Sequence, residues 1–308
     1  MSPSPRKNLL LCLDAFGTLF RPKRPIAQQY GEIARKYGIT GFSETELTEK
    51  FHEAFKKERS RNPNYGKVNG VDASQWWSNV INATFKPFVS SGAAVPERMT
   101  SELMTRFSNS DGYQMFEDVM PFFKSLRELR KSTHKNSKKT HEWPWEQTVV
   151  GIISNSDDRV PGVLRSFGLD VSPQMFGRTE SGIETNHAEN DIDFVVMSYD
   201  VGVVKPDPGI FKAAETLLAQ HLSRNTESIR YIDSFEMLYV GDSMAEDVIG
   251  ARRAGWSSML IDRSKESLSM EHRRKLIMDA WRTNASMEAS LMPLLSWKPL
   301  DSGDSDQV

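Results

Sequence analysis

The sequence predicts a doubly wound, mostly parallel α/β sheet with an inserted helical cap. Two observations lead to this fold class. Apolar runs of strand length end in polar or acidic residues, and most of them alternate with stretches of helical periodicity. The stretch after the first run contains only helical patterns, which interrupts the alternation. We therefore expect an α/β core formed by residues 1–20 and 118–308, and a helical cap formed by residues 21–117.

The first predicted strand is the apolar run Leu9–Leu13, which leads into Asp14 and then into a turn with Phe16, Gly17 and Thr18. A carboxylate at the carboxyl end of a buried strand lies where open α/β sheets bind their ligands. Strands also end in Asp for turn chemistry alone. The glycine turn that follows favours a nucleophile exposed in a pocket.

The predicted cap begins with a helix over residues 26–37, where apolar residues recur on one stripe. Ser43 and Glu46 form a capping-box pattern that starts a second helix. A third helix is predicted over residues 76–85. Val119 then begins the helix that returns the chain to the core.

Three further apolar runs are predicted as core strands, and each leads to polar residues with chemical potential. These are Val149–Ile153, followed by Ser154 and Asn155; Phe194–Met197, whose following loop reaches Lys205 and Pro206; and Met237–Val240, followed by Gly241, Asp242 and Asp247.

These polar residues are the types that a phosphoryl-transfer site needs. A carboxylate can attack phosphorus and form an aspartyl-phosphate. A hydroxyl and a lysine can hold the phosphoryl oxygens, and acidic oxygens from two strands can hold Mg²⁺. Each piece also has a structural explanation: Ser154 and Asn155 as a helix cap, Lys205 as an exposed turn, and Asp242 and Asp247 as a solvated helix start. Their common position after apolar runs favours a site.

The same segments, residues 8–20 and 118–263, resemble the haloacid dehalogenase superfamily, whose members are mostly phosphatases. Residues 62–66 and 75–77 resemble the helical cap of one group within this superfamily, the haloacid dehalogenase-like hydrolase domain-containing protein 3 group. The resemblance implies a Rossmann-like core and Mg²⁺ as cofactor. It also implies a role for each motif residue. The metal ligands would be Asp14, the Phe16 carbonyl, Asp242 and Asp247. Asp14 would be the nucleophile, with Ser154 and Lys205 as the other catalytic residues, and the substrate would be bound by Phe16, Gly17, Thr18 and Asn155. Asp247 would support the metal or pair with Lys205.

One departure from the family pattern is Phe16. The family's phosphatases usually have a second Asp there as general acid and base, and phenylalanine carries no proton. The family's dehalogenases have an aromatic residue there, but they typically lack the Gly-Asp pair, and they have Tyr where this chain has Phe211. We expect an enzyme, a Mg²⁺-dependent phosphohydrolase of a small phosphorylated molecule. A hydrolytic dehalogenase and a non-catalytic binding or regulatory protein stay open as alternatives.

Composition narrows the expected partners. The net charge of −2 gives no reason to expect nucleic acid, and no run approaches the length of a membrane span. The single cysteine, Cys12, fits a reducing compartment, and the six histidines lack metal-ligand spacing. The first seven residues are too short and polar for a signal peptide. We expect a cytoplasmic protein, with the nucleus as a second location, that acts on a small phosphate ester.

Two polar segments, residues 131–147 and 180–193, are predicted as surface insertions. The first is basic and contains Trp143 and Trp145, and such a loop can bind nucleic acid. A solvated loop is the simpler interpretation.

Overall fold

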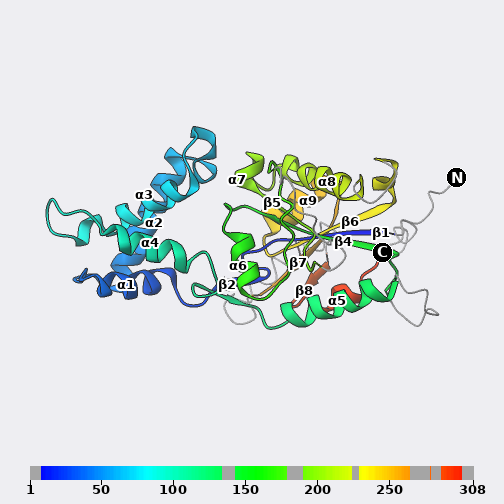
Figure 1. The fold of residues 1–308 in the computed structure, drawn as a ribbon, viewed down its shortest axis with the longest axis horizontal. Helices are drawn as coiled ribbons and strands as arrows, with labels where there is room; N and C mark the ends of the chain where they lie inside the picture. Colours follow the sequence, from blue (N-terminus) through cyan, green and yellow to red (C-terminus); the bar gives the residue numbers. More distant parts are fainter. Residues whose placement is uncertain are drawn as a thin grey trace.

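The computed structural model describes residues 8–133, 143–178, 190–223, 229–263, 278 and 286–299. Its centre is a six-stranded sheet in the order β5-β4-β1-β6-β7-β8, and every neighbouring pair is parallel (Figure 1). The strands are β1 (Asn8–Leu13), β4 (Gln147–Ser154), β5 (Phe194–Met197), β6 (Phe235–Gly241), β7 (Ser257–Ile261) and β8 (Ser286–Glu288). The predicted parallel α/β fold is confirmed, and β7 and β8 extend it beyond the strands that the sequence indicated.

Helices cover both faces of this sheet (Figure 1). They are α5 (Val119–Thr133), α6 (Val160–Ser166), α7 (Ser198–Val201), α8 (Pro208–Ser223) and α9 (Ile249–Arg253). Successive residues of β1 alternate between the faces, because side chains of a strand point to opposite sides. Leu9 and Leu11 pack in the cluster that includes α5, whereas Leu10 and Cys12 pack in the cluster that includes α8. Double coverage explains why every residue of β1 is buried.

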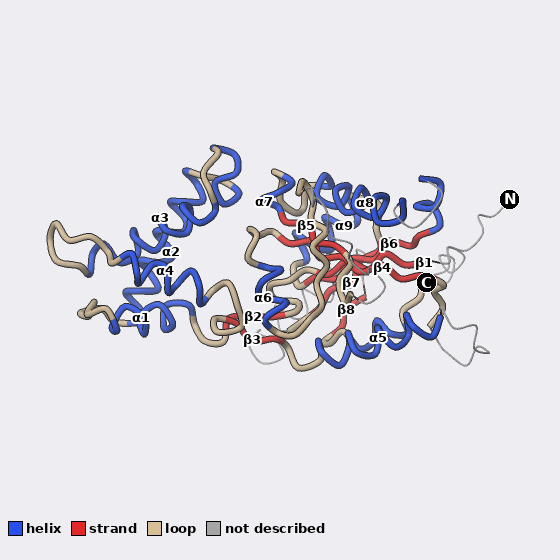
Figure 2. Tube along the Cα trace, in the orientation of Figure 1, coloured by secondary structure: helices blue, strands red, loops and turns tan. Residues whose placement is uncertain are grey.

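A group of four helices lies apart from the sheet, beyond the carboxyl ends of its strands (Figures 1 and 2). The helices are α1 (Ile26–Lys36), α2 (Glu44–Arg61), α3 (Ala73–Phe85) and α4 (Glu97–Arg106). The Ser43–Glu46 capping box forms with both of its hydrogen bonds. Buried aromatic rings, among them Tyr30, Phe51 and Trp76, fill the space between these helices. The cap boundaries at residues 21 and 117 stay a prediction.

Two short strands that the sequence did not reveal join the helical group to the sheet. They are β2 (Phe20–Pro22) and β3 (Tyr113–Met115), which pair antiparallel. Phe16 packs between them, with ring centroids 4.7 Å from Phe20 and 5.5 Å from Tyr113. Short helical turns complete the described chain: η1 (Asn64–Asn69), η2 (Lys86–Phe88), η4 (Ile229–Ser234), η5 (Met244–Val248) and η6 (Met292–Ser296).

Both expected surface insertions contain buried residues in their described parts, so a wholly solvated loop is the wrong interpretation there. Trp143 and Trp145 are buried, and Trp145 stacks on Trp297 with ring centroids 5.9 Å apart. Asp191 and Asp193 are also buried, where they pair with arginines of α5 at 2.7 and 2.9 Å. The remainders of both segments, residues 134–142 and 179–189, lie outside the described residues. Within the described part of the chain, no helix combines the length and apolar character that crossing a membrane requires.

Candidate active site

The carboxyl edge of the sheet brings Asp14 next to the ends of β4 and β6. Leu13, the last residue of β1, is in register with Ile152 on one side and Val240 on the other. The Asp14 backbone N–H donates to the carbonyl of Val240 at 2.9 Å, which fixes the position of the turn. Polar residues that follow neighbouring parallel strands therefore meet around Asp14.

Lys205 lies at the centre of these groups and is almost completely buried. Its ammonium Nζ is 2.8 Å from Asp14 Oδ1 and 2.8 Å from Asp247 Oδ1. It also donates to the Tyr239 hydroxyl at 2.8 Å and to the Ile153 carbonyl at 3.3 Å. The Tyr239 hydroxyl in turn donates to that carbonyl at 2.7 Å. Every donor of the ammonium is directed to an oxygen, so the lysine is rigidly positioned.

Burial and neighbouring charges change the acidity of this pair. Burial raises the pKa of Asp14 to about 6; Lys205 opposes this rise and the Asp247 charge adds to it. Burial alone would lower the pKa of Lys205, but Asp14 and Asp247 raise it above its ordinary value. The lysine therefore stays charged and favours the ionised form of Asp14.

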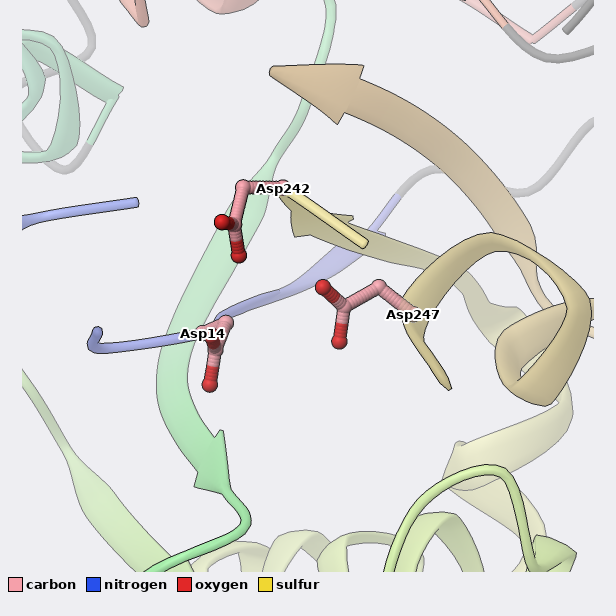
Figure 3. A group of neighbouring side chains, drawn as sticks. All are labelled: Asp14, Asp242 and Asp247. Carbon is pink, nitrogen blue, oxygen red and sulfur yellow. The ribbon is translucent and has the colours of Figure 1, made fainter. Parts of the chain in front are cut away.

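Asp242 completes a group of three carboxylates (Figure 3). One oxygen each from Asp14, Asp242 and Asp247 lies within 4.8 Å of the others. Asp242 is exposed, whereas the other two are buried. Partial desolvation and the charges of Asp14 and Asp247 raise the pKa of Asp242 to about 7. Three carboxylates therefore share one buried ammonium, that of Lys205.

Two glycines make room for these carboxylates. A Cβ atom on Gly17 would lie 2.1 Å from Asp242 Oδ2, and one on Gly241 would lie 2.3 Å from the Asp247 carboxyl. Gly17 also has a φ of +78°, which other residues rarely adopt. The glycines of both motifs are thus required by the close approach of backbone and carboxylate.

Asn155 holds the loop that carries Lys205. Its Oδ1 accepts from the Lys205 backbone N–H at 2.7 Å, and its Nδ2 donates to the Lys205 carbonyl at 3.1 Å. Nδ2 also donates to Glu246 Oε2 at 3.0 Å. Asn155 therefore positions Lys205, although its prediction as a substrate-binding residue stays open.

The other predicted residues lie around this centre. Ser154 is buried at the end of β4. Thr18 is fully buried, its hydroxyl has no hydrogen-bond partner among the described residues, and its carbonyl accepts from Arg263 at 2.8 Å. The side chain of Phe16 packs in the aromatic group at the β2–β3 junction. Their assigned roles stay predictions.

The helical group reaches the sheet edge through η1. Asn64 and Tyr65 have φ values of 49° and 55°, which are uncommon for residues other than glycine. Contacts to the core hold this conformation: Asn64 Nδ2 donates to the Ser198 carbonyl at 2.7 Å, and the Tyr65 hydroxyl donates to the Asn155 carbonyl at 3.0 Å. Such strain persists only where surrounding contacts determine it.

A second link connects Trp77 of α3 to the core. Its indole N–H donates to Asp157 Oδ2 at 2.6 Å. Arg159 pairs with Asp157 at 2.8 Å, and its guanidinium lies 4.2 Å from the centre of a Trp77 ring. No pattern in the sequence anticipated that Asp157 and Arg159 contact the helical group.

A pocket of about 260 Å³ lies between the helical group and the sheet edge. Its walls come from α2, η1 and α3 on one side and from the loops after the strands on the other. The lining residues are Phe55, Arg59, Asn64, Tyr65, Trp76, Asn155, Val204, Lys205 and Glu246.

Sequence reasoning missed Tyr239, Glu246, Tyr65 and Arg59 as parts of this site. A signal existed for Tyr239, because a tyrosine within an apolar strand needs a partner for its hydroxyl. No local pattern distinguishes Glu246 or Arg59 from the exposed acidic and basic residues around them.

Comparisons with known proteins agree with this geometry. Residues 9–255 match the family model described as haloacid dehalogenase-like hydrolase. The chain is 31% identical to an uncharacterized protein of Saccharomyces cerevisiae over 83% of this chain and 72% of that protein. It is 27% identical to haloacid dehalogenase-like hydrolase domain-containing protein 3 of Mus musculus, over 85% and 88% of the two chains.

A solved structure shows the same fold at low identity. The 2-haloacid dehalogenase of Pseudomonas syringae pv. Tomato has a TM-score of 0.51 and 16% identity, over 93% of this chain and 97% of that one. The family match covers most of the chain, and the family's motif residues meet at one sheet edge. The chain therefore belongs to the haloacid dehalogenase-like hydrolase family.

Proposed function

We propose that the protein is a Mg²⁺-dependent phosphohydrolase that acts on a small phosphate ester through an aspartyl-phosphate intermediate. The observation that carries this proposal is the group of Asp14, Asp242 and Asp247 around a single ammonium. When all three carboxyls are ionised, they and Lys205 leave two negative charges uncompensated. A divalent cation would compensate these two negative charges.

The oxygen atoms available here suit Mg²⁺. It is a hard cation that takes carboxylate and carbonyl oxygens and keeps several waters. Asp14 and Asp242 would hold it, with the Phe16 carbonyl as a further ligand. When bound, the ion would neutralise charge that develops on the phosphoryl oxygens.

Asp14 is the nucleophile in this proposal. Lys205 binds Oδ1, which leaves Oδ2 for attack on phosphorus. The new bond joins Oδ2 to phosphorus, the bond from phosphorus to the ester oxygen breaks, and its electron pair leaves with that oxygen. Water then attacks the phosphorus atom of the aspartyl-phosphate, releases inorganic phosphate, and restores the Asp14 carboxylate. The water's protons pass to phosphate and solvent.

Lys205 and Ser154 would bind the phosphoryl oxygens. Because Lys205 is buried with Asp14 and Asp247, its charge acts in a medium of low polarity. In this arrangement Asp247 pairs with Lys205 and holds the ammonium in position. Phe16 supplies no proton to the departing oxygen, so stable leaving groups are favoured.

The test is phosphate release from para-nitrophenyl phosphate and acetyl phosphate, with Mg²⁺ and with a chelator. Activity that requires Mg²⁺ and disappears in Asp14→Asn supports the proposal. Turnover by Asp14→Asn near the wild-type rate would exclude the mechanism. An exposed carboxylate on the helical group, Glu53, offers the control variant Glu53→Gln, which should keep full activity.

Hydrolytic dehalogenation is the second candidate, and Phe16 is the observation that favours it. In that reaction Asp14 attacks carbon, halide leaves with the bonding electrons, and water hydrolyses the ester at the carboxyl carbon. No proton donor is needed for halide, which matches a phenylalanine at this position. Halide release from 2-chloropropionate in the presence of chelator would support this candidate over the first.

A further inference from the structure

We propose that the substrate carries a second anionic group, a carboxylate, which Arg59 binds at the wall of the pocket opposite the sheet edge. This inference rests on the proposed phosphohydrolase function and names the substrate class more closely. It makes Arg59 a residue that determines specificity, away from the groups that react.

The pocket joins Arg59 to Lys205, whose ammonium contacts the Asp14 carboxylate. Arg59 belongs to α2 of the helical group, and Lys205 belongs to the core, yet both line the same pocket of about 260 Å³. This volume lies just below the usual range for small-molecule sites, which begins at roughly 300 Å³. A ligand of that size, with its phosphoryl group near Lys205, has its other end near α2.

The charges of the pocket favour an anion at that end. Lys205 faces the Asp14 and Asp247 carboxylates and would bind the phosphoryl group, so a second acidic group needs another cation. Arg59 is exposed, and within the described ranges of the chain its guanidinium has no ion-pair or hydrogen-bond partner. Glu246 is the one acidic side chain among the lining residues, and its Oε2 accepts a hydrogen bond from Asn155 Nδ2. A guanidinium without a partner, in a pocket wall, is suited to a carboxylate.

The space between the two charged ends is lined by aromatic rings. Phe55, Tyr65 and Trp76 contribute them, and the ring centroids of Phe55 and Tyr65 each lie 5.3 Å from that of Trp76. The hydrogen bonds of Asn64 and Tyr65 to the core hold this wall in position. A flat or apolar linker between the phosphate and the carboxylate therefore fits the pocket.

The binding test uses two phosphonates that cannot be hydrolysed, para-carboxyphenylphosphonate and its para-carbamoyl counterpart. They have nearly the same shape and differ in the charge at one end. Calorimetric titration with Mg²⁺ should show about tenfold tighter binding of the carboxylate to the wild-type protein, as expected for one charge-assisted hydrogen bond at a partly exposed site. Arg59→Gln should remove this difference and leave the affinity for the carbamoyl compound unchanged. Arg59→Lys should restore part of it.

Lys57→Gln is the matched control, because Lys57 is an exposed cation of the same helix that does not line the pocket. It should keep the tenfold preference. Equal loss of preference in Lys57→Gln and Arg59→Gln would show a general charge effect and overturn the inference. Equal binding of the two phosphonates to wild type, or no binding of either, would also overturn it.

Turnover of the corresponding aryl phosphates separates this inference from the proposed function. Hydrolysis of both esters with equal kcat/KM, in wild type and Arg59→Gln alike, would leave the phosphohydrolase proposal in place and reject the role of Arg59. Selective binding of the carboxylate without any phosphate release would keep the role of Arg59 and reject the proposed function.

Discussion

Lys205 Nζ lies 2.8 Å from Asp14 Oδ1, although the two residues are 191 positions apart in the sequence. Both side chains are buried, and the lysine also contacts Asp247 and Tyr239. This contact joins the carboxyl ends of neighbouring strands through one cation. It keeps one ammonium among the carboxylates of the site whether or not a ligand is bound.

Removal of that cation should destabilise the fold as well as the activity. Lys205→Met leaves Asp14 and Asp247 buried without a partner, and breaking a buried ion pair typically costs about 3–5 kcal/mol. Urea unfolding measures this loss. Lys212→Met, which removes an exposed lysine of α8, should change stability by less than about 0.5 kcal/mol. Similar midpoints for the two variants would show that the buried pair contributes little.

Metal binding should require Asp242. Calorimetric titration of the wild-type protein with Mg²⁺ should show binding that Asp242→Ala loses, because the variant removes an exposed ligand from a group of only three carboxylates. Asp158→Ala removes an exposed carboxylate elsewhere on the core and should bind Mg²⁺ like the wild type. Unchanged affinity in Asp242→Ala would mean that the metal lies elsewhere.

The metal-free protein should lose stability as the acidic group ionises. In the folded state the pKa values of Asp14 and Asp242 rise to about 6 and about 7, above the ordinary value of 3.8. The folded chain therefore binds these protons more tightly than the unfolded chain between pH 4 and 7, and this contribution to stability falls as pH rises through that window.

Asp242→Asn tests this sign. With chelator present, its melting temperature should match that of the wild type near pH 4 and exceed it at pH 8, because the amide does not ionise. The effect is limited in size, since Asp242 is exposed and solvent screens its charge. Saturating Mg²⁺ should reverse the order at pH 8. A difference between the proteins that is the same at both pH values would contradict the assignment.

Phe16 should make the leaving group decisive. Because the ring gives no proton, aryl and acyl phosphates should react faster than alkyl phosphates. Phe16→Asp should narrow that gap by at most ~10²–10⁴-fold, the usual contribution of a positioned acid or base. Comparison of kcat for both substrate classes in wild type and variant measures it. Equal wild-type rates on the two classes would show that another group supplies the proton.

The packing of Phe16 adds a cost to that variant. Its ring contacts Phe20 and Tyr113 at the β2–β3 junction, so an aspartate there should lower stability by about 2 kcal/mol or more. Phe16→Leu keeps most of the apolar contact without a carboxyl, and it separates the loss of packing from the gain of an acid.

The sequence by itself determined where the strands β1, β4, β5 and β6 lie along the chain and which polar residues follow them. These features are local: an apolar run marks a buried strand, and the residues that follow it lie at the edge where parallel strands end. The same locality made the Ser43–Glu46 capping box and the helix over Trp76 and Trp77 predictable. Local periodicity also distinguished the all-helical pattern of the predicted cap from the alternating strand and helix pattern of the predicted core.

Only the tertiary structure decided which residues meet across long distances in the chain. Trp143 and Asp191 look like members of polar surface segments, yet they are buried because other elements cover them. Tyr239 became part of the site because Lys205 and Ile153 converge on its hydroxyl, and Arg59 lines the pocket because α2 faces the sheet edge. Local composition records a residue's chemistry, whereas burial and pairing depend on long-range packing, and packing is a property of the whole fold.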